Sequence, residues 1–340
     1  MRGMVAPRSG APLKSEYLLR RTILSIVCAT YVITAELHTF RPAPGVPLPS
    51  VRTGATVVLS AAVLMAVARP TLSAAHAYRA EARFWSAVRV PVSLPADARA
   101  LNLHAVEFSS SDGARIRGWY IPSVNGSGVI LCHGSESNRM SMLPHARALA
   151  RRGIGVLMMD WPGQGESDGV MRMGEPERQA FHAAVDFMSK RGDVTQERIG
   201  ALGFSMGSYI VAQIAALDER VASVVLEGAF GDADERIEAQ FANKGWLSSR
   251  VALLADRQAG FVSDILRPID MVGRIAPRFL LVVAGDQDQD VPLELSRRLF
   301  KAAGPPKMLW IIRGTGHGHY ADHDSTYLRR LADHFASTLR

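Results

Sequence analysis

The chain has 340 residues, 48% of them hydrophobic and 21% charged, and this composition excludes a disordered protein. The net charge of +7 is confined to one end, because residues 1–100 contain 12 Lys/Arg and 4 Asp/Glu, whereas residues 101–340 contain 27 and 28. Since this basic excess accompanies apolar runs, and no zinc-finger spacing or basic face with interleaved aromatic residues is present, we expect a membrane partner and no nucleic acid.

Residues 1–90 are predicted to form a membrane-associated region. Apolar runs at 22–35 and 54–68 have flanking arginines, and we expect two short transmembrane helices at about 18–37 and 53–69. Four prolines in the connection 41–50 forbid a continuous helix. Two alternatives stay open: the first run is also compatible with a secretory signal, and the second with a core helix.

Basic residues predict the orientation of this region. Five precede the first run, two lie in the connection and four follow the second run. Lys and Arg collect on the cytoplasmic side of membrane proteins, so we expect both ends inside and the catalytic domain in the cytoplasm. The signal alternative would instead export the domain, for example to a periplasm.

From about residue 91 the chain alternates strand-type and helix-type runs, which predicts an α/β domain over 91–340 with a mostly parallel sheet. Residues 104–109 and 115–121 flank a Ser-Asp-Gly turn and are expected to form an opening hairpin. Further strands are expected at 128–132, 154–160, 198–204, 221–227, 279–284 and 308–313, and helices at 140–151, 176–191, 206–217, 292–303 and 325–339.

Two G-x-S-x-G patterns compete for the role of nucleophile motif. Ser205 lies between the strand-type run 198–204 and the helix-type run 206–217, which is the context in which this motif exposes a reactive serine. Ser167 follows a Trp-Pro-Gly loop and is interpreted as a turn residue. We therefore predict Ser205 as the nucleophile.

Two further motifs precede Ser205 in the chain. Residues 131–139 read LCHGSESNR and residues 160–167 read DWPGQGES, each after a predicted strand. Together with GFSMG, they resemble the HG turn, the D-x-x-G-x-G-x-S loop and the nucleophile motif of the α/β-hydrolase fold family. The resemblance covers residues 128–340 and implies an eight-stranded, mostly parallel sheet flanked by helices, with a helical lid insertion at about 231–278.

The family's order of serine, acid and histidine implies the other two catalytic residues. The family's spacing G-x-x-D-x-x-V-P implies that Asp288 is the acid, whereas Asp286 is compatible with a turn and Asp290 with a helix cap. His317 follows the last predicted strand in a G-x-x-H-like loop and is the expected base, with His319 as the alternative.

One metal motif competes with this assignment. The sequence from His317 through His319 and Asp322 to His323 resembles the H-x-H-x-D-H pattern of metallo-hydrolases, but it has one residue too many before the aspartate. That pattern also needs further ligands downstream, where few residues remain. We therefore expect no metal and no cofactor.

A serine hydroxyl needs a base and an orienting acid, so the expected reaction is acyl transfer through an acyl-enzyme on Ser205. The resemblance implies an oxyanion hole formed by the backbone N–H groups of Ser135 and Met206. We expect a carboxylic ester substrate, a small molecule or lipid-like; a thioesterase, a peptidase and a catalytically silent binding protein are the alternatives. The sequence does not set an oligomeric state.

The predicted lid is rich in apolar residues, among them Phe241, Trp246, Leu254 and Phe261. They are compatible with an acyl-chain pocket that faces a nearby membrane. They are also compatible with a helical cap whose apolar face packs on the sheet.

Overall fold

The computed structural model describes residues 50–85, 89–261 and 266–340. The chain forms two compact units, Met1–Arg69 and Pro70–Arg340, and helix α2 (Ser50–Trp85) contains residues of both. The first predicted membrane helix lies outside the described residues, and the second lies within α2. In the three described ranges, no helix combines the length and the apolar character needed to cross a bilayer.

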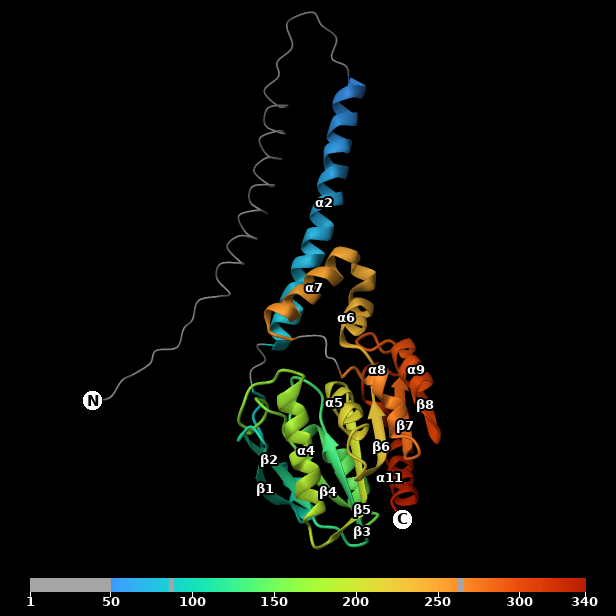
Figure 1. Ribbon diagram of the computed structural model, residues 1–340. Coiled ribbons are helices and arrows are strands. Elements are labelled where there is room, and N and C mark those ends of the chain that lie inside the picture. The colour runs from blue at the N-terminus through green and yellow to red at the C-terminus, as the bar shows by residue number, and fades with distance from the viewer. Residues whose placement is uncertain (1–49, 86–88, 262–265) are drawn as a thin grey trace, which may run out of the picture. The chain divides into compact units, whose positions relative to one another are not determined.

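The second unit is built on one eight-stranded sheet (Figure 1). The spatial order is β1-β2-β4-β3-β5-β6-β7-β8, with β2 antiparallel to both neighbours and the strands from β4 to β8 parallel. The predicted opening hairpin and the mostly parallel sheet are therefore confirmed. The strands are β1 His104–Ser109, β2 Arg115–Ile121, β3 Gly126–Cys132, β4 Gly155–Met159, β5 Val194–Phe204, β6 Val221–Glu227, β7 Phe279–Gly285 and β8 Lys307–Ile312.

Strand β5 begins at Val194, earlier than the sequence predicts. Its first residues after Val194, Thr195 to Glu197, are polar and exposed, whereas residues 199–203 are buried. Hydrophobic pattern detects the buried part of a strand, so the solvated beginning of β5 was missed. The carboxyl end of β5, where the nucleophile motif lies, was predicted at the correct residue.

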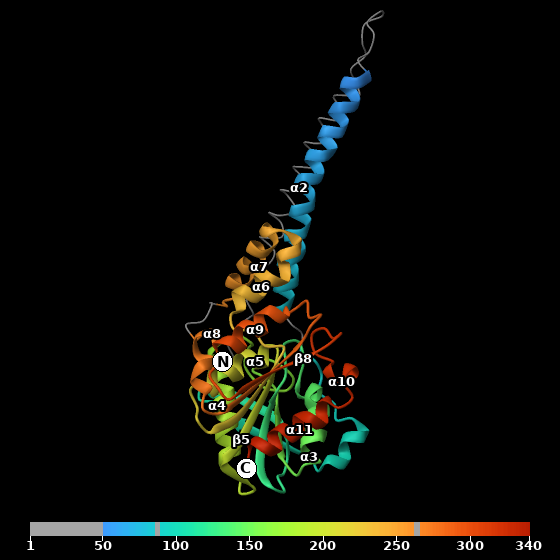
Figure 2. The ribbon, with the colours of Figure 1, turned by 90° about the vertical axis from the view of Figure 1, so that its right-hand side faces the viewer.

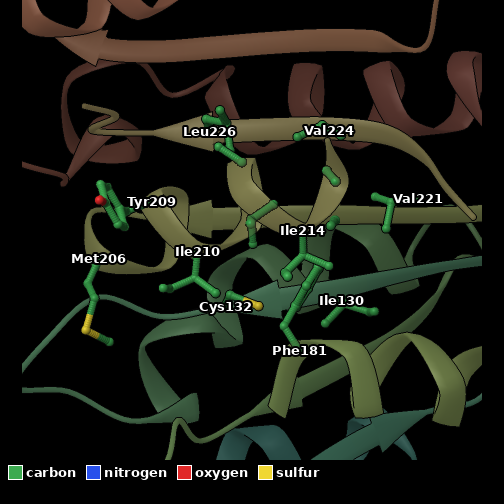
Figure 3. Packing of buried hydrophobic residues seen from close by; sticks show 14 of the residues in the cluster. Ile130, Cys132, Phe181, Met206, Tyr209, Ile210, Ile214, Val221, Val224 and Leu226 are labelled. Atoms are coloured by element: carbon green, nitrogen blue, oxygen red, sulfur yellow. The ribbon is translucent and has the colours of Figure 1, made fainter. Parts of the chain in front are cut away.

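Helices cover both faces of the sheet (Figures 1 and 2). One face packs against α4 (Glu175–Ser189), α5 (Met206–Ala215) and α9 (Leu293–Ala302), and the other against α3 (Leu143–Ala150) and α11 (Tyr327–Thr338). Figure 3 shows Ile210 and Ile214 of α5 close to Ile130 of β3 and Phe181 of α4. Helix α5, which starts directly after Ser205, is buried at every position.

The insertion between β6 and β7 is helical. It contains α6 (Ala233–Phe241), a 3₁₀ turn (Ala242–Lys244), α7 (Trp246–Gln258), α8 (Pro268–Met271) and a second 3₁₀ turn (Val272–Ile275). Phe241 and Phe261 are buried in apolar clusters, whereas Trp246 and Leu254 are 78% and 51% exposed. These apolar residues therefore divide between packing and surface.

The last part of α2 packs against this insertion. Ala77 joins Ile237, Phe241 and Ala252 in one apolar cluster. Near it, the Tyr78 hydroxyl donates a 2.8 Å hydrogen bond to Oε1 of Gln258. The insertion and the last turns of α2 thus form a small helical layer, which we call the cap (residues 70–85 and 231–261).

A buried carboxyl group lies inside the cap. Glu81 of α2 is 3% exposed, and its Oε1 lies 3.6 Å from a guanidinium nitrogen of Arg236 on α6. Burial raises the pKa of Glu81 to about 7; Arg236 lowers this pKa, and the carboxyl groups of Asp256 and Glu136 raise it further. The Glu81 side chain is therefore held where its charged form is disfavoured.

We predict that Glu81→Gln stabilises the protein at pH 8 but not at pH 5. The folded-state pKa of Glu81 lies above the unfolded value of about 4.3, so its contribution to stability is present at low pH and is lost as the pH rises through 7. Gln cannot ionise and escapes this loss. Urea denaturation at both pH values measures the difference, with exposed Glu238→Gln as control. An unchanged or lower free energy of unfolding at pH 8 would contradict the prediction.

Candidate active site

Ser205 lies on a sharp turn between β5 and α5. Its backbone has φ 52° and ψ −117°, a conformation that costs a non-glycine residue on the order of 1–3 kcal/mol. The N–H of Ser205 donates a 2.8 Å hydrogen bond to the carbonyl of Glu227, the last residue of the neighbouring strand β6. The turn is therefore pinned to the sheet while the serine side chain is presented beyond the strand end.

The two glycines of the motif permit this turn because the backbone is crowded there. A Cβ on Gly203 would lie 2.3 Å from the carbonyl oxygen of Gly207. A Cβ on Gly207 would lie 2.4 Å from the carbonyl oxygen of Cys132 on β3. Both distances are far below van der Waals contact, so side chains at these positions would push α5 away from the sheet.

Asp288 follows β7 and points its carboxylate toward His317. Its Oδ1 accepts hydrogen bonds from the N–H groups of Asp290 (2.9 Å) and Val291 (2.8 Å), and its Oδ2 lies 2.7 Å from Nδ1 of His317. Asp288 is 6% exposed. The loop after β7 therefore fixes one carboxylate oxygen and leaves the other for the imidazole.

The competing aspartates have other partners. Asp286 accepts a 2.7 Å hydrogen bond from the N–H of Gly314 and so ties together the loops after β7 and β8. Asp290 is exposed and contacts the amide of Gln240 on α6 at 3.3 Å. Asp290 does not cap a helix, because α9 begins at Leu293 with Pro292 before it.

His317 bridges the serine and the carboxylate. Its Nε2 lies 2.8 Å from Oγ of Ser205, on the side of the ring opposite to the Nδ1 that faces Asp288. A carboxylate at Nδ1 favours the tautomer with the proton on Nδ1, which leaves the Nε2 lone pair to accept the serine proton. The three side chains predicted from the sequence thus lie in one hydrogen-bonded chain.

The two predicted oxyanion-hole donors belong to segments that adjoin Ser205. Met206 is the first residue of α5, and the first N–H groups of a helix have no carbonyl partner within that helix. Ser135 follows the turn His133–Gly134, and a Cβ on Gly134 would lie 3.4 Å from Cβ of Ser205. The turn after β3 therefore approaches the nucleophile closely, as an oxyanion hole requires.

His133 holds this turn in place. Its ring is fully buried, Nδ1 lies 2.6 Å from the carbonyl of Gly134, and Nε2 accepts a hydrogen bond from the N–H of Trp161 at 3.3 Å. Burial lowers the pKa of His133 to about 4, so the imidazole is neutral at physiological pH. A neutral ring can donate at Nδ1 and accept at Nε2, which matches its two contacts.

The second G-x-S-x-G pattern has no strand-to-helix turn. Ser167 is fully buried, donates to the carbonyl of Asp160 (2.9 Å) and accepts from the N–H of Arg117 (2.9 Å). In the same loop, the buried Asp160 carboxylate pairs with Arg139 and accepts from the N–H of Glu166 at 2.9 Å. Ser167 therefore has the local structural role that the sequence predicts.

The metal motif is not assembled. The side chains of His319 and Asp322 are 82% and 73% exposed and pair with each other at 3.3 Å. In the described part of the chain, the residues close enough to share an ion are Asp288, Asp290 and His317, without His319, Asp322 or His323. A metal at this cluster would compete with the His317 contacts to Asp288 and Ser205.

One buried residue at the site was missed in the sequence. Glu227 ends β6, is 2% exposed and contacts His145 at 3.1 Å and the Tyr327 hydroxyl. The signal was present: a carboxylate ends a strand whose preceding residues are mostly apolar, beside the strand that carries the nucleophile motif. Such strand ends meet at the ligand-binding edge of a parallel sheet.

Comparison with known proteins identifies relatives for most of the second unit. Residues 129–266 match the model of a family described as alpha/beta hydrolase fold. The chain is 31% identical over 220 residues to the uncharacterized protein Rv2307c of Mycobacterium tuberculosis, covering 62% of this chain and 71% of that protein. It is 25% identical over 249 residues to the uncharacterized protein YfhR of Escherichia coli K12, covering 69% and 81%.

Solved structures share the fold. The esterase Pf2001 of Pyrococcus furiosus superimposes with a TM-score of 0.63 and 21% identity, covering 74% of this chain and 97% of the esterase. The alpha/beta hydrolase GrgF of a Penicillium species superimposes with a TM-score of 0.58 and 22% identity, covering 70% and 99%. These identities are low, so the likeness concerns the fold.

We predict that Ser205→Gly is more stable than Ser205→Ala by about 1 kcal/mol. Both variants lose the hydroxyl, but glycine adopts φ 52° without the steric cost that alanine keeps. Glycine loses more conformational entropy on folding than alanine, and this loss offsets part of the gain. Urea denaturation of the two variants measures the difference. Equal stability, or a more stable alanine variant, would show that the turn is not strained.

Proposed function

We propose that this chain, which belongs to the α/β-hydrolase fold family, is a serine hydrolase that cleaves carboxylic esters through an acyl-enzyme on Ser205. The observation that carries the proposal is the hydrogen-bonded chain from Ser205 through His317 to Asp288, with contacts of 2.8 Å and 2.7 Å. A hydroxyl, an imidazole and a buried carboxylate in this order are the elements of nucleophilic acyl transfer.

In the proposed reaction His317 accepts the proton of Ser205 as the Oγ atom attacks the carbonyl carbon of the ester. Asp288 keeps the imidazole in the reactive tautomer and stabilises the imidazolium. The N–H groups of Ser135 and Met206 bind the oxyanion of the tetrahedral intermediate, and removing one such donor typically costs roughly 100- to 1000-fold in rate. The imidazolium then protonates the departing alcohol, and water hydrolyses the acyl-enzyme by the same steps.

An ester substrate is favoured by the fold relatives. Pf2001 is named an esterase, and its fold superimposes on about three quarters of this chain. The residue at the nucleophile position of the G-x-S-x-G motif is a serine, Ser205, which supports acyl transfer. Enzymes with an aspartate at this position catalyse other reactions. The same triad also serves thioesters and amides, so the leaving group is the point on which the proposal must be tested.

We predict that a fluorophosphonate probe labels the wild type and fails to label Ser205→Ala, because the probe reacts with an activated serine. Asp288→Asn is expected to lower kcat for ester hydrolysis by roughly 10⁴-fold through the wrong imidazole tautomer. Ser167→Ala and Asp290→Asn are matched controls from the second motif and the same loop, and they should react like the wild type. Labelling of Ser205→Ala at the wild-type level would refute the assignment.

A substrate panel completes this test. Matched esters, thioesters and amides of the same acyl group, from acetyl to octanoyl, separate the three acyl-transfer activities by kcat/KM. The proposal expects the esters to be hydrolysed fastest relative to their uncatalysed rates. Labelling by the probe together with preferred cleavage of thioesters or amides would keep the serine mechanism and replace the substrate class.

We also propose that residues 1–90 hold the enzyme at a membrane, with the catalytic domain on the cytoplasmic side. The basic excess of residues 1–100 supports this location. The apolar side chains of Val63 and Met65 on α2 also support a membrane location, because they are 57% and 66% exposed. Exposed apolar side chains in a row favour a lipid or protein neighbour.

We predict that a reporter enzyme fused after residue 95 is active when the reporter requires the cytoplasm and inactive when it requires export. Fractionation of the same cells should recover the fusion with the membranes at low salt. A fusion that is active only outside the cytoplasm would support the signal alternative, and recovery in the supernatant would contradict the membrane proposal.

A further inference from the structure

A cavity of about 360 Å³ adjoins the triad on the side of His317. Its wall is formed by the turn after β3 that contains Gly134 and Ser135, by the start of α3, and by the segment from His317 to Leu328. This volume lies at the small end of the range for small-molecule sites. No residue of α6 or α7 in the described part of the chain belongs to the wall, so the cavity is separate from the cap.

The cavity has a buried carboxylate in its wall. Glu227 lines it, and two side chains contact Oε1 of Glu227: Nε2 of His145 at 3.1 Å and the hydroxyl of Tyr327. Among the described residues none donates a hydrogen bond to the second oxygen, Oε2. The side chain as a whole is 2% exposed, so an apolar group that displaced water from Oε2 would leave this oxygen without a donor, at a cost in free energy.

Two other polar atoms around the same cavity are also without partners in the described residues. They are Nδ1 of His145 and the hydroxyl of Tyr320, and both residues line the wall. Tyr320 is 3% exposed, and burial together with the charges of Glu227 and Asp288 raises the pKa of its hydroxyl, whereas the nearby backbone N–H groups of Gly228 and Gly318 lower this pKa. Native proteins leave few buried polar groups unpaired, so these two atoms beside one cavity favour an occupant that forms hydrogen bonds.

The chemistry of these groups defines the occupant. The Glu227 carboxylate can only accept hydrogen bonds, and an apolar group in the cavity would remove water from it without replacing the lost contact. A hydroxyl or ammonium group would donate to Oε2. An unsubstituted acyl chain offers no hydrogen-bond donor. The cavity wall therefore favours a substrate with a polar group on the part that enters the cavity.

We propose that this cavity, the Glu227 cavity, is a substrate subsite that selects esters with a hydrogen-bond-donating group, a hydroxyl or an amine, on the part of the molecule that enters it. This inference rests on the proposed serine hydrolase function. Glu227 is a substrate-binding residue in it, held in position by His145 of α3 and Tyr327 of α11.

The test compares matched substrates on the full-length wild type. One series is methyl hexanoate, methyl 6-hydroxyhexanoate and methyl 6-aminohexanoate, and the other is pentyl, 5-hydroxypentyl and 5-aminopentyl butyrate. Their kcat/KM values are measured by titration of the released acid. We expect the hydroxyl or amino member of at least one series to exceed its methyl-terminated partner by tenfold or more, because a hydrogen bond to a charged group contributes that much. Comparison of the hydroxyl and amino members then shows which of the two donor groups the subsite prefers.

Glu227→Gln separates recognition from mere stabilisation of the fold. This variant keeps the shape and an acceptor for Tyr327 but removes the charge, so we expect the ratio of kcat/KM for the donor ester to kcat/KM for its methyl-terminated partner to fall about tenfold. Glu227→Asp keeps the charge one methylene further back and should give an intermediate preference. Glu177→Gln, a fully buried carboxylate on α4 outside the cavity wall, is the matched control and should keep the wild-type preference.

Two outcomes would overturn the inference: equal kcat/KM for donor and methyl-terminated esters in the wild type, or an equal loss on all substrates in Glu227→Gln. Both can occur while the fluorophosphonate probe still labels Ser205, in which case the serine hydrolase proposal stands without this subsite. Absence of labelling in the wild type would instead remove the proposed function itself. The wild-type comparison needs no variant, so it decides the question even if Glu227→Gln fails to fold.

Discussion

The backbone turn at Ser205 is the constraint on which the site depends. It is possible because Gly203 lets β5 approach the start of α5, and Gly207 lets α5 approach the end of β3, to distances that exclude a Cβ, and because the Ser205 N–H is bonded to the end of β6. The turn sets three things together: the direction of the Ser205 side chain, the position of the helix N-terminus at Met206, and the spacing to the turn after β3. A serine held on such a turn is positioned in advance for the reaction proposed above.

The sheet topology supplies the partners of the nucleophile. Strands β5, β7 and β8 are parallel, so their carboxyl ends meet at one edge, and the loops that follow them carry Ser205, Asp288 and His317. Loop lengths and local contacts then place each group, as when the N–H groups of Asp290 and Val291 fix one oxygen of Asp288. Residues separated by 112 positions in the chain thereby lie within 2.8 Å.

Sequence reasoning predicted the sheet and the three converging side chains because strand periodicity and short glycine motifs are local signals. It selected Asp288 over Asp286 and Asp290 from spacing, and the structure gives these three residues different partners. It missed Glu227 although a carboxylate at the end of a mostly apolar strand was visible in the sequence. The contacts of Glu227 with His145 and Tyr327, which join β6, α3 and α11, are fixed by tertiary packing and have no sequence spacing that predicts them. Sequence reasoning also left the lid residues undecided, since Phe241 and Trp246 are equally apolar yet one is buried and the other exposed.

The packing of α2 against α6 and α7 determines which residues a stable recombinant form of the second unit must contain. Family resemblance starts near residue 128, yet Ala77 covers Ile237 and Phe241, and the Asn138 amide donates to the carbonyls of Val90 (3.0 Å) and Pro91 (3.2 Å). A recombinant fragment that begins near residue 128 would expose the apolar side chains of Ile237 and Phe241 to solvent. It would also lack the two carbonyl groups to which the Asn138 amide donates. A recombinant protein therefore has to begin at or before Pro70 to keep these contacts.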